Sequence, residues 1–196
     1  VQAWTFLDPD YSRAQARQRD EERRRVGAPP GLLHGVPVGV KDVIDTRDMP
    51  TENGTVLHAG RRPTLDAVVV ERLRAAGAVI LGKTVTTELA VYAAGKTRNP
   101  QDPTRSPGGS SSGSAAAVSD RMVPVAVGSQ TNGSVIRPAA YCGCFGFKPS
   151  FGLIPRVGIL AQSRRLDHVG TFARRIEDLA LLTETLIGFD ARDPDT

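Results

Sequence analysis

Two loops rich in serine and glycine are the part of this sequence that points most directly to chemistry. They span residues 108–114 and 128–134 and flank a short apolar run. Glycine lets backbone N–H groups approach an anionic group, and each loop also carries several hydroxyls. Upstream, Lys41 ends the stretch 35–40, whose valines and glycines indicate a buried strand. Hydroxyls, N–H groups and a buried lysine are components of nucleophilic catalysis.

These segments resemble the amidase signature family of serine hydrolases, which cleaves carboxamides with a Ser–Ser–Lys triad instead of Ser–His–Asp. The resemblance covers nearly the whole chain, because further motifs follow in the family's order and at its spacing. A single Gly-Gly-Ser-Ser loop would be weak evidence, whereas the ordered set is specific. The other matching segments are residues 6–8, 32–42, 81–84, 99–100, 145–150, 166–170 and 190–194.

The resemblance assigns three catalytic residues, and each suits its role chemically. Ser134 is the expected nucleophile, since it follows Gly133 at a loop-to-helix transition where a side chain can be exposed. Lys41 is the expected general base, because burial disfavours the ammonium form of a lysine, whose ordinary pKa is about 10.4. Ser110 is the expected proton relay, and it precedes Ser134 by 24 residues, the family's spacing. Taken alone, Ser134 could be a helix cap and Lys41 a surface residue.

The loop around Ser134 supplies the expected oxyanion hole. The resemblance places this hole at the backbone N–H groups of four consecutive residues, Thr131, Asn132, Gly133 and Ser134. Supporting positions behind the triad are expected at Ser111, Ser129, Gln130 and Arg137. We expect the hydroxyls of Thr131 and Ser129 to serve the loop's own hydrogen bonds. Ser111 and Ser112 are alternative relay residues by proximity alone, and capping of the following helix is their expected role.

The resemblance also predicts the backbone geometry of the relay residue. The peptide bond from Gly109 to Ser110 should be cis, a form that residues other than proline adopt rarely and mainly at functional sites. The hydroxyl of Ser110 should lie within about 2.6–3.2 Å of both the Lys41 amine and the Ser134 hydroxyl.

Four departures from the family's usual pattern change the polar scaffold and leave the triad intact. Gln130 stands where the family usually has aspartate, and Asn132 where it often has glycine. Arg137 follows Ser134 by three residues instead of two, and Ser112 stands where glycine is commoner. These differences suggest a subgroup with its own substrate preference.

Two other kinds of site fit fragments of the sequence less well. Residues 77–84 match the P-loop pattern, but the intervening Ala-Val-Ile-Leu favours a strand over a flexible phosphate-binding loop. The residues available for a Ser–His–Asp triad are His34, His58 and His168, with Asp42, Asp45 and Asp167 as partners. The first and last of these histidines resemble structural turns of the family, and three dispersed histidines do not indicate a metal site.

Composition places the chain among globular proteins and limits its partners. It has 196 residues, of which 40% are hydrophobic, and no run approaches the ~18 apolar residues that a membrane span needs. Residues 12–25 supply most of the net charge of +4, with interleaved acids and no aromatic residue, which favours a solvated helix face over a nucleic-acid patch. Cys142 and Cys144 are poorly spaced for a disulfide and are expected to be reduced.

The reduced cysteines and the N-terminus predict a cytoplasmic protein. The first ten residues lack the basic-then-apolar order of a signal peptide. The chain opens without methionine and the resembled family is usually longer, so residues 1–196 are expected to be one domain, the N-terminal catalytic portion of a longer amidase. The resemblance implies a small-molecule amide substrate, no cofactor or metal, and no nucleic-acid or membrane partner, and it allows a homodimer.

Alternating strand and helix patterns predict an α/β fold with a mixed, largely parallel sheet that is flanked by helices and incomplete at the C-terminus. Helices are expected at 12–25, ended by Gly27 through Gly31, at 66–76 with Asp66 as the cap, from Ser112 to Val118, from Ser134 onward, and at 175–187. Strands are expected at 36–44, 78–81 and 122–127.

The function that these patterns support is hydrolysis of a linear carboxamide through a seryl acyl-enzyme. A close alternative within the resembled family is the amidotransferase component that supplies ammonia for amidating misacylated tRNA. An alternative of a different class is a non-catalytic fragment whose Ser/Gly loops only bind a ligand.

Overall fold

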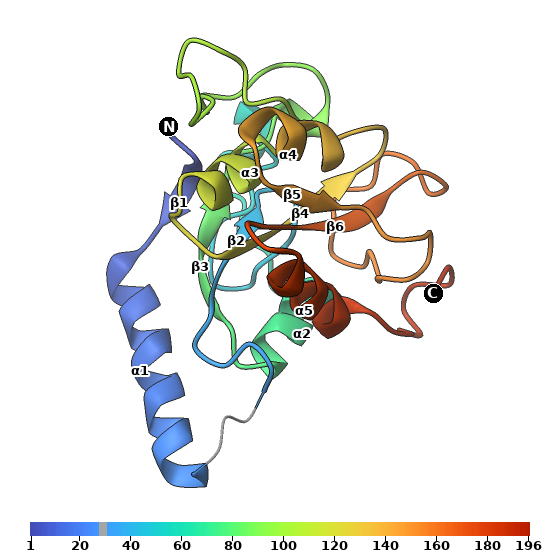
Figure 1. The fold of residues 1–196 in the computed structure, drawn as a ribbon. Coiled ribbons are helices and arrows are strands. Elements are labelled where there is room, and N and C mark those ends of the chain that lie inside the picture. The colour runs from blue at the N-terminus through green and yellow to red at the C-terminus, as the bar shows by residue number, and fades with distance from the viewer. Residues whose placement is uncertain (28–30) are drawn as a thin grey trace.

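A computed structural model describes residues 1–27 and 31–196, which form a six-stranded sheet with helices on both faces (Figure 1). The strands are β1 (Trp4–Leu7), β2 (Pro37–Lys41), β3 (Val79–Thr84), β4 (Val125–Gln130), β5 (Phe145–Phe147) and β6 (His168–Ala173). The helices are α1 (Pro9–Val26), α2 (Val68–Ala75), α3 (Ser112–Ser119), α4 (Ile136–Cys142) and α5 (Ile176–Leu186). Two short 3-10 helices are η1 (Val56–His58) and η2 (Glu88–Ala90).

The sheet has its parallel strands at the centre. The strand order is β1-β3-β2-β4-β6-β5. β2 pairs in parallel with both β3 and β4, whereas β1, β5 and β6 pair with their neighbours in antiparallel fashion. The central strands are buried on both faces, which explains their nearly continuous apolar runs. The mixed α/β sheet is confirmed, and antiparallel strands make up more of it than the sequence indicated.

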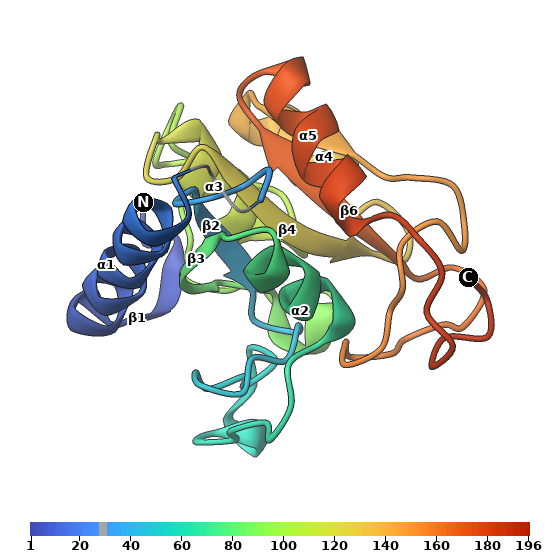
Figure 2. The ribbon, with the colours of Figure 1, turned by 90° about the horizontal axis from the view of Figure 1, so that it is seen from below.

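Helices cover the two faces of the sheet in pairs (Figures 1 and 2). α3 and α4 pack together on one face, and α2 and α5 pack together on the other. The larger apolar cluster includes Leu73 of α2 and Leu182 of α5. The smaller cluster combines the alanines of α3 with Phe172 of β6. The small residues of α3 let this helix pack closely against the sheet.

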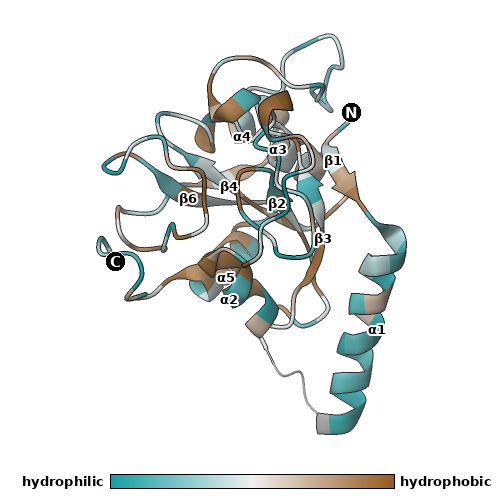
Figure 3. Cartoon of the chain, turned by 180° about the vertical axis from the view of Figure 1, so that it is seen from behind, coloured by the Kyte–Doolittle hydropathy of each residue, from teal (hydrophilic) through white to brown (hydrophobic). Residues whose placement is uncertain are grey.

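α1 extends from the body of the molecule, and its surface is mostly hydrophilic (Figures 1 and 3). Asp8 caps it by accepting hydrogen bonds from the N–H groups of Asp10 and Tyr11, so the helix begins earlier than predicted. Gly27 ends it in the left-handed conformation with φ 75°. The sequence predicted that residues 27–31 end this helix, and residues 28–30 of that segment lie outside the described residues. No helix in the described part of the chain combines the length and apolarity that crossing a membrane requires.

The segment that imitates a P-loop is a strand. β3 runs from Val79 through Thr84, so Gly82 and Lys83 belong to a buried strand instead of a phosphate-binding loop. Gly77, with φ 83°, follows α2 directly. This arrangement confirms that the P-loop match is accidental.

Other predicted boundaries shift by a few residues. Asp66 does not cap α2, because its carboxylate accepts hydrogen bonds from the backbone of Arg47 and from Nε of Arg74 instead. β2 ends at Lys41, β4 covers residues 125–130, and α5 closely matches its predicted span.

Gly113 is the point of closest approach between α3 and the first part of the chain. A Cβ at this position would lie 2.3 Å from the carbonyl oxygen of Ala3 and 2.3 Å from the backbone nitrogen of Val85. The N–H of Gly113 also donates to the carbonyl of Val85 at 2.9 Å. Only glycine therefore lets α3 start against the end of β3.

We expect Gly113→Ala to lower the free energy of unfolding by at least about 1–3 kcal/mol, because backbone on both sides must move. Urea unfolding of the protein measures this change. The matched control is Gly133→Ala, since a Cβ there would meet nothing closer than 3.8 Å. Equal stability of the two variants would contradict the steric account.

Candidate active site

The parallel strands at the centre of the sheet bring the predicted catalytic segments to one edge. β2 ends at Lys41 and β4 ends at Gln130, with Val40 opposite Val127 in the register. Because parallel strands end at the same edge, Lys41 lies beside the loop that follows β4. A Cβ on Gly128 would lie 2.7 Å from the hydroxyl oxygen of Ser111, so glycine there lets the first Ser/Gly loop pack against β4.

Lys41 is completely buried, at 0% exposure. Its Nζ lies 2.7 Å from the hydroxyl oxygen of Ser110, 3.0 Å from that of Ser129, and 3.4 Å from the carbonyl oxygen of Ser129. Burial lowers the pKa of Lys41 to about 7, although the charge of Asp167 acts in the opposite direction. A substantial fraction of Lys41 is therefore neutral at neutral pH, which is the form that can accept a proton.

The peptide bond between Gly109 and Ser110 is cis, as predicted. Backbone oxygens on both sides of it are held in place. The carbonyl of Ser110 accepts from the N–H of Thr87 at 3.1 Å, and the carbonyl of Gly109 accepts from Nε of Arg137 at 2.9 Å. Arg137 therefore ties the segment that contains Ser110 to α4.

Ser134 is joined to the first loop through its backbone. Its carbonyl accepts from the N–H of Ser111 at 3.2 Å, and the residue is 7% exposed. Among the hydrogen bonds of the described residues, none connects the hydroxyls of Ser134 and Ser110. The expected contact of Ser110 with Lys41 is present, whereas its expected hydrogen bond to Ser134 is not among those of the described residues.

Gln130 shapes the loop that follows β4. Its side-chain oxygen accepts from the N–H groups of Val135 at 2.8 Å and Ile136 at 3.0 Å. Its side-chain amide donates to the carbonyl of Asn132 at 3.1 Å. Within the described residues, no hydrogen bond uses the N–H groups of residues 132–134 as donors. Uncommitted N–H groups in a tightly held loop are what an oxyanion hole requires.

The hydroxyls of three serines bond differently from the prediction. Ser129 contacts Lys41 instead of serving its own loop. Ser111 stands at the N-cap position of α3, but its hydroxyl donates to the carbonyl of Ser129 at 3.1 Å. The hydroxyl of Ser112 donates to the carbonyl of Val85 at 3.3 Å. The predicted side-chain capping of α3 is wrong, because both hydroxyls donate to backbone carbonyls instead of accepting from an N–H of the helix.

Thr131 also reaches outside its loop, contrary to the prediction. Its hydroxyl oxygen lies 2.6 Å from Oδ1 of Asp167 and 2.8 Å from Oε1 of Gln162. The other carboxylate oxygen of Asp167 accepts from the N–H groups of Gln162 and Ser163, both at 2.8 Å. The sequence analysis named Asp167 only within the matching segment 166–170 and as a partner for a catalytic histidine. Recognition of β6 as a strand beside β4 would have placed Asp167 opposite Thr131.

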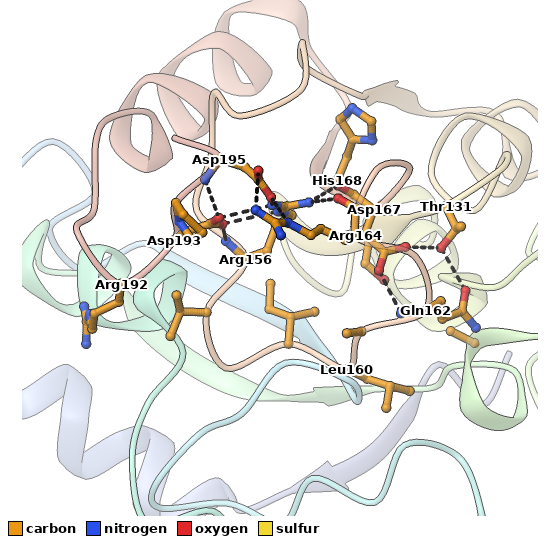
Figure 4. A pocket seen from close by; sticks show the side chains of 16 residues that line it. Thr131, Arg156, Leu160, Gln162, Arg164, Asp167, His168, Arg192, Asp193 and Asp195 are labelled. Atoms are coloured by element: carbon orange, nitrogen blue, oxygen red, sulfur yellow. Dashed lines mark hydrogen bonds and ion pairs between the residues drawn. The ribbon is translucent and has the colours of Figure 1, made fainter.

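A cavity of about 280 Å³ lies beside this cluster (Figure 4). Ser129 and Thr131 line the cavity on the side of the candidate catalytic loop. Leu160 contributes an apolar part of the lining, and Arg156 lies among acidic residues in another part. Ser134 and Ser110 do not line the cavity. The cavity therefore adjoins the candidate site at Ser129 and Thr131.

A comparison with protein families agrees with this geometry. The family model described as Amidase matches residues 1–196, which is the whole of this sequence. The chain belongs to the Amidase family.

Curated relatives and solved structures extend this assignment. A glutamyl-tRNA(Gln) amidotransferase subunit of Chloroflexus aurantiacus is 45% identical, covering 98% of this chain and 41% of the relative. Its counterpart in Acidothermus cellulolyticus is also 45% identical, with 98% and 39% covered. The structure of the peptide amidase from Stenotrophomonas maltophilia is similar with a TM-score of 0.93 at 40% identity, covering 100% of this chain and 42% of that chain. The chain thus spans 39–42% of the length of these three Amidase-family relatives.

A second buried lysine lies next to the candidate site. Nζ of Lys83 is 3.8 Å from the carboxylate of Asp42, the residue that follows Lys41. That carboxylate also accepts from the N–H groups of Glu52 and Gly54. Burial lowers the pKa of Lys83 to about 8, and the charge of Asp42 opposes this change. Lys83 and Asp42 therefore hold the turn after β2.

The histidines bond elsewhere. Nδ1 of His58 lies 2.9 Å from the side-chain amide of Asn53, and Nδ1 of His168 lies 2.7 Å from the carbonyl oxygen of Leu166. Nδ1 of His34 is buried without a hydrogen-bond partner among the residues described. These contacts give no support to a histidine-based triad in this member of the Amidase family.

We expect the free energy of unfolding to rise with pH between about pH 7 and pH 9. Lys41 has a pKa of about 7 when folded and 10.5 ordinarily, so the unfolded chain binds more protons in this range and becomes relatively more favourable as pH falls. Lys41→Met should flatten the rise by at most about 1.4 kcal/mol per pH unit. Urea unfolding at a series of pH values measures the slope.

Lys83→Met is the matched comparison. Because the pKa of Lys83 in the folded protein is about 8, this substitution should flatten the rise in the free energy of unfolding mainly above pH 8. Above pH 9 the thiols act in the opposite direction, because burial raises the pKa of Cys142 and Cys144 to about 12. If Lys41→Met does not change the slope of the free energy of unfolding against pH, the pKa of Lys41 is not lowered in the folded protein.

Proposed function

We propose that this chain carries the catalytic core of an amidohydrolase, which cleaves a linear carboxamide to an acid and ammonia or an amine. The observation that carries the proposal is the 2.7 Å contact between the buried Lys41 amine and the hydroxyl of Ser110. A buried amine with a pKa of about 7, bonded to a hydroxyl, suits a proton-transfer role.

In the first half-reaction, the hydroxyl of Ser134 attacks the carbonyl carbon of the amide. Its proton passes to Ser110 as Ser110 gives its own proton to the neutral amine of Lys41. The backbone N–H groups of residues 131–134 donate to the oxyanion that forms. When the C–N bond breaks, the proton held by Lys41 returns through Ser110 to the leaving nitrogen, and the acyl group stays on Ser134.

In the second half-reaction, a water molecule attacks the ester carbonyl of the acyl-enzyme. The same relay takes the proton of the water and returns one to the oxygen of Ser134 as the acid leaves. Gln130 holds the loop of donors throughout, through its bonds to Val135, Ile136 and Asn132.

A second candidate function is that of an amidotransferase component, which generates ammonia for transfer. The 45% identity to the glutamyl-tRNA(Gln) amidotransferase protein of Chloroflexus aurantiacus favours this candidate. The chemistry at Ser134 would be the same, and the ammonia would be consumed by a partner instead of being released. Free ammonia formed from simple amides without a partner supports the hydrolase.

We expect Ser134→Ala to abolish turnover of short aliphatic, aryl or urea-like amides, measured as release of ammonia or amine. Lys41→Ala and Ser110→Ala should each lower kcat/KM by about 10³-fold or more. Because the three residues act as a unit, combining the last two substitutions should cost little more than the worse single one. Activity like that of the unmodified protein in Lys41→Ala would contradict the lysine base.

Covalent labelling checks the nucleophile independently of any substrate. A fluorophosphonate should modify Ser134, seen as a mass increase on the peptide that contains it. The matched control is Ser112→Ala, whose hydroxyl is bonded to the carbonyl of Val85 and should not affect labelling. Persistent labelling of Ser134→Ala would exclude this nucleophile, and no labelling at all would favour a ligand-binding fragment.

The pH dependence of kcat/KM should follow the ionisation of Lys41. Only the neutral amine accepts a proton, so kcat/KM is expected to rise through a midpoint near pH 7 and then reach a plateau. Steady-state kinetics on the protein and on His168→Asn provide the measurement. A decline above neutral pH would contradict the lysine base. Loss of the acid limb, the rising part of the profile, in His168→Asn would indicate a histidine base instead.

A further inference from the structure

Asp167, which directly precedes β6, is hydrogen-bonded to the loop of residues 131–134, called here the oxyanion loop. Gln130 and His168 are paired in the antiparallel register of β4 and β6, so the next residues outward, Thr131 and Asp167, face each other. The carboxylate of Asp167 lies 2.6 Å from the hydroxyl of Thr131. Its second oxygen is fixed by two backbone N–H groups, at residues 162 and 163. The carboxylate is therefore held rigidly against the first residue of the loop.

The same carboxylate lines a cavity together with Ser129, which contacts the candidate base. Asp167, Ser129 and Thr131 line one cavity, and the hydroxyl of Ser129 is 3.0 Å from Nζ of Lys41 (Figure 4). The charge of Asp167 is felt at Lys41, where it favours the ammonium form and raises the pKa against the effect of burial. Nothing in the sequence pattern had given Asp167 such a role.

We propose that Asp167 is a positioning residue of the candidate active site, which anchors Thr131 of the oxyanion loop and provides a negative charge on the side of the site where Ser129 contacts Lys41. This inference rests on the proposed amidohydrolase function. It assigns two separable effects to one carboxylate, a hydrogen bond that holds the loop and a charge that favours the protonated base.

Other charged groups around Lys41 are engaged elsewhere. On β3, the residue opposite Lys41 is the uncharged Thr84, while Lys83 pairs with Asp42. The segment 112–119 that forms α3 contains no ionisable side chain. Arg137 of α4 donates to the carbonyl of Gly109.

β4, which pairs with β2, contains no titratable side chain, and the next strand, β6, contributes His168. Its ring is bonded to the carbonyl of Leu166, and burial lowers its pKa. Asp167 is the charged group that favours the ammonium form of Lys41.

The first test replaces the charge and keeps the shape. In Asp167→Asn, the amide oxygen can accept from the N–H groups of Gln162 and Ser163, and the amide nitrogen can donate to the hydroxyl of Thr131. That hydroxyl can then donate to Oε1 of Gln162, which already lies 2.8 Å away. We expect the acid limb of the kcat/KM profile to move to lower pH, because Lys41 loses the charge that favours its ammonium form.

The matched control for charge is Glu177→Gln, which removes an exposed carboxylate on α5 and should leave the acid limb in place. Thr131→Val isolates the hydrogen bond, because it removes the hydroxyl and keeps the carboxylate. This variant should lose about tenfold in kcat while its acid limb keeps the midpoint of the unmodified protein. It also tests the proposal if Asp167→Asn does not fold.

The outcomes separate the two levels of the proposal. If Ser134→Ala still hydrolyses amides, the proposed function fails, and the inference fails with it. If activity requires Ser134 but the profile of Asp167→Asn superimposes on that of the unmodified protein, the charge effect of Asp167 is overturned alone. An unchanged kcat in Thr131→Val would overturn the proposal that Asp167 holds the loop through its hydrogen bond to Thr131.

Discussion

The burial of Lys41 sets the conditions for everything around it. An ammonium removed from water without a paired carboxylate is so unfavourable that the group gives up its proton at a lower pH. Among the described residues, the hydrogen-bond partners of Lys41 are oxygens of Ser110 and Ser129. Lys83, equally buried, keeps Asp42 at 3.8 Å, and its pKa falls less far, to about 8. Burial lowers the pKa of both lysines, and a carboxylate opposes this change in each case, Asp167 for Lys41 and Asp42 for Lys83.

Gln130 illustrates how the scaffold accommodates a departure from the usual family pattern. Its oxygen accepts two backbone hydrogen bonds, as the aspartate more usual in the family also could. Only an amide can in addition donate to the carbonyl of Asn132, because an ionised carboxylate has no proton to give. Glutamine also adds no negative charge beside Lys41, which leaves Asp167 as the carboxylate whose field reaches the amine.

The sequence by itself determined what depends on local pattern and on the order of motifs. The Ser/Gly loops and Lys41 indicated the family and, through the resemblance, the cis bond before Ser110, while the alternation of strand and helix patterns predicted the α/β sheet. The apolar run within 77–84 was enough to reject a P-loop, since branched residues such as Val79 and Ile80 favour a strand over a flexible loop. These features depend on neighbours in the sequence. β1 and β5, with four and three residues, were missed because they have too few residues to show a pattern. β6 was also missed, although it is as long as β3 and β4.

Only the tertiary structure decided which hydroxyl meets which partner. Ser129 turned out to contact Lys41, and Thr131 to contact Asp167, although the sequence assigned both hydroxyls to their own loop. These contacts depend on the pairing of β4 with β2 on one side and with β6 on the other, across sequence separations that no local pattern encodes. A serine or threonine offers the same hydroxyl to any acceptor within reach, so its role is fixed by the register of the strands and not by its type.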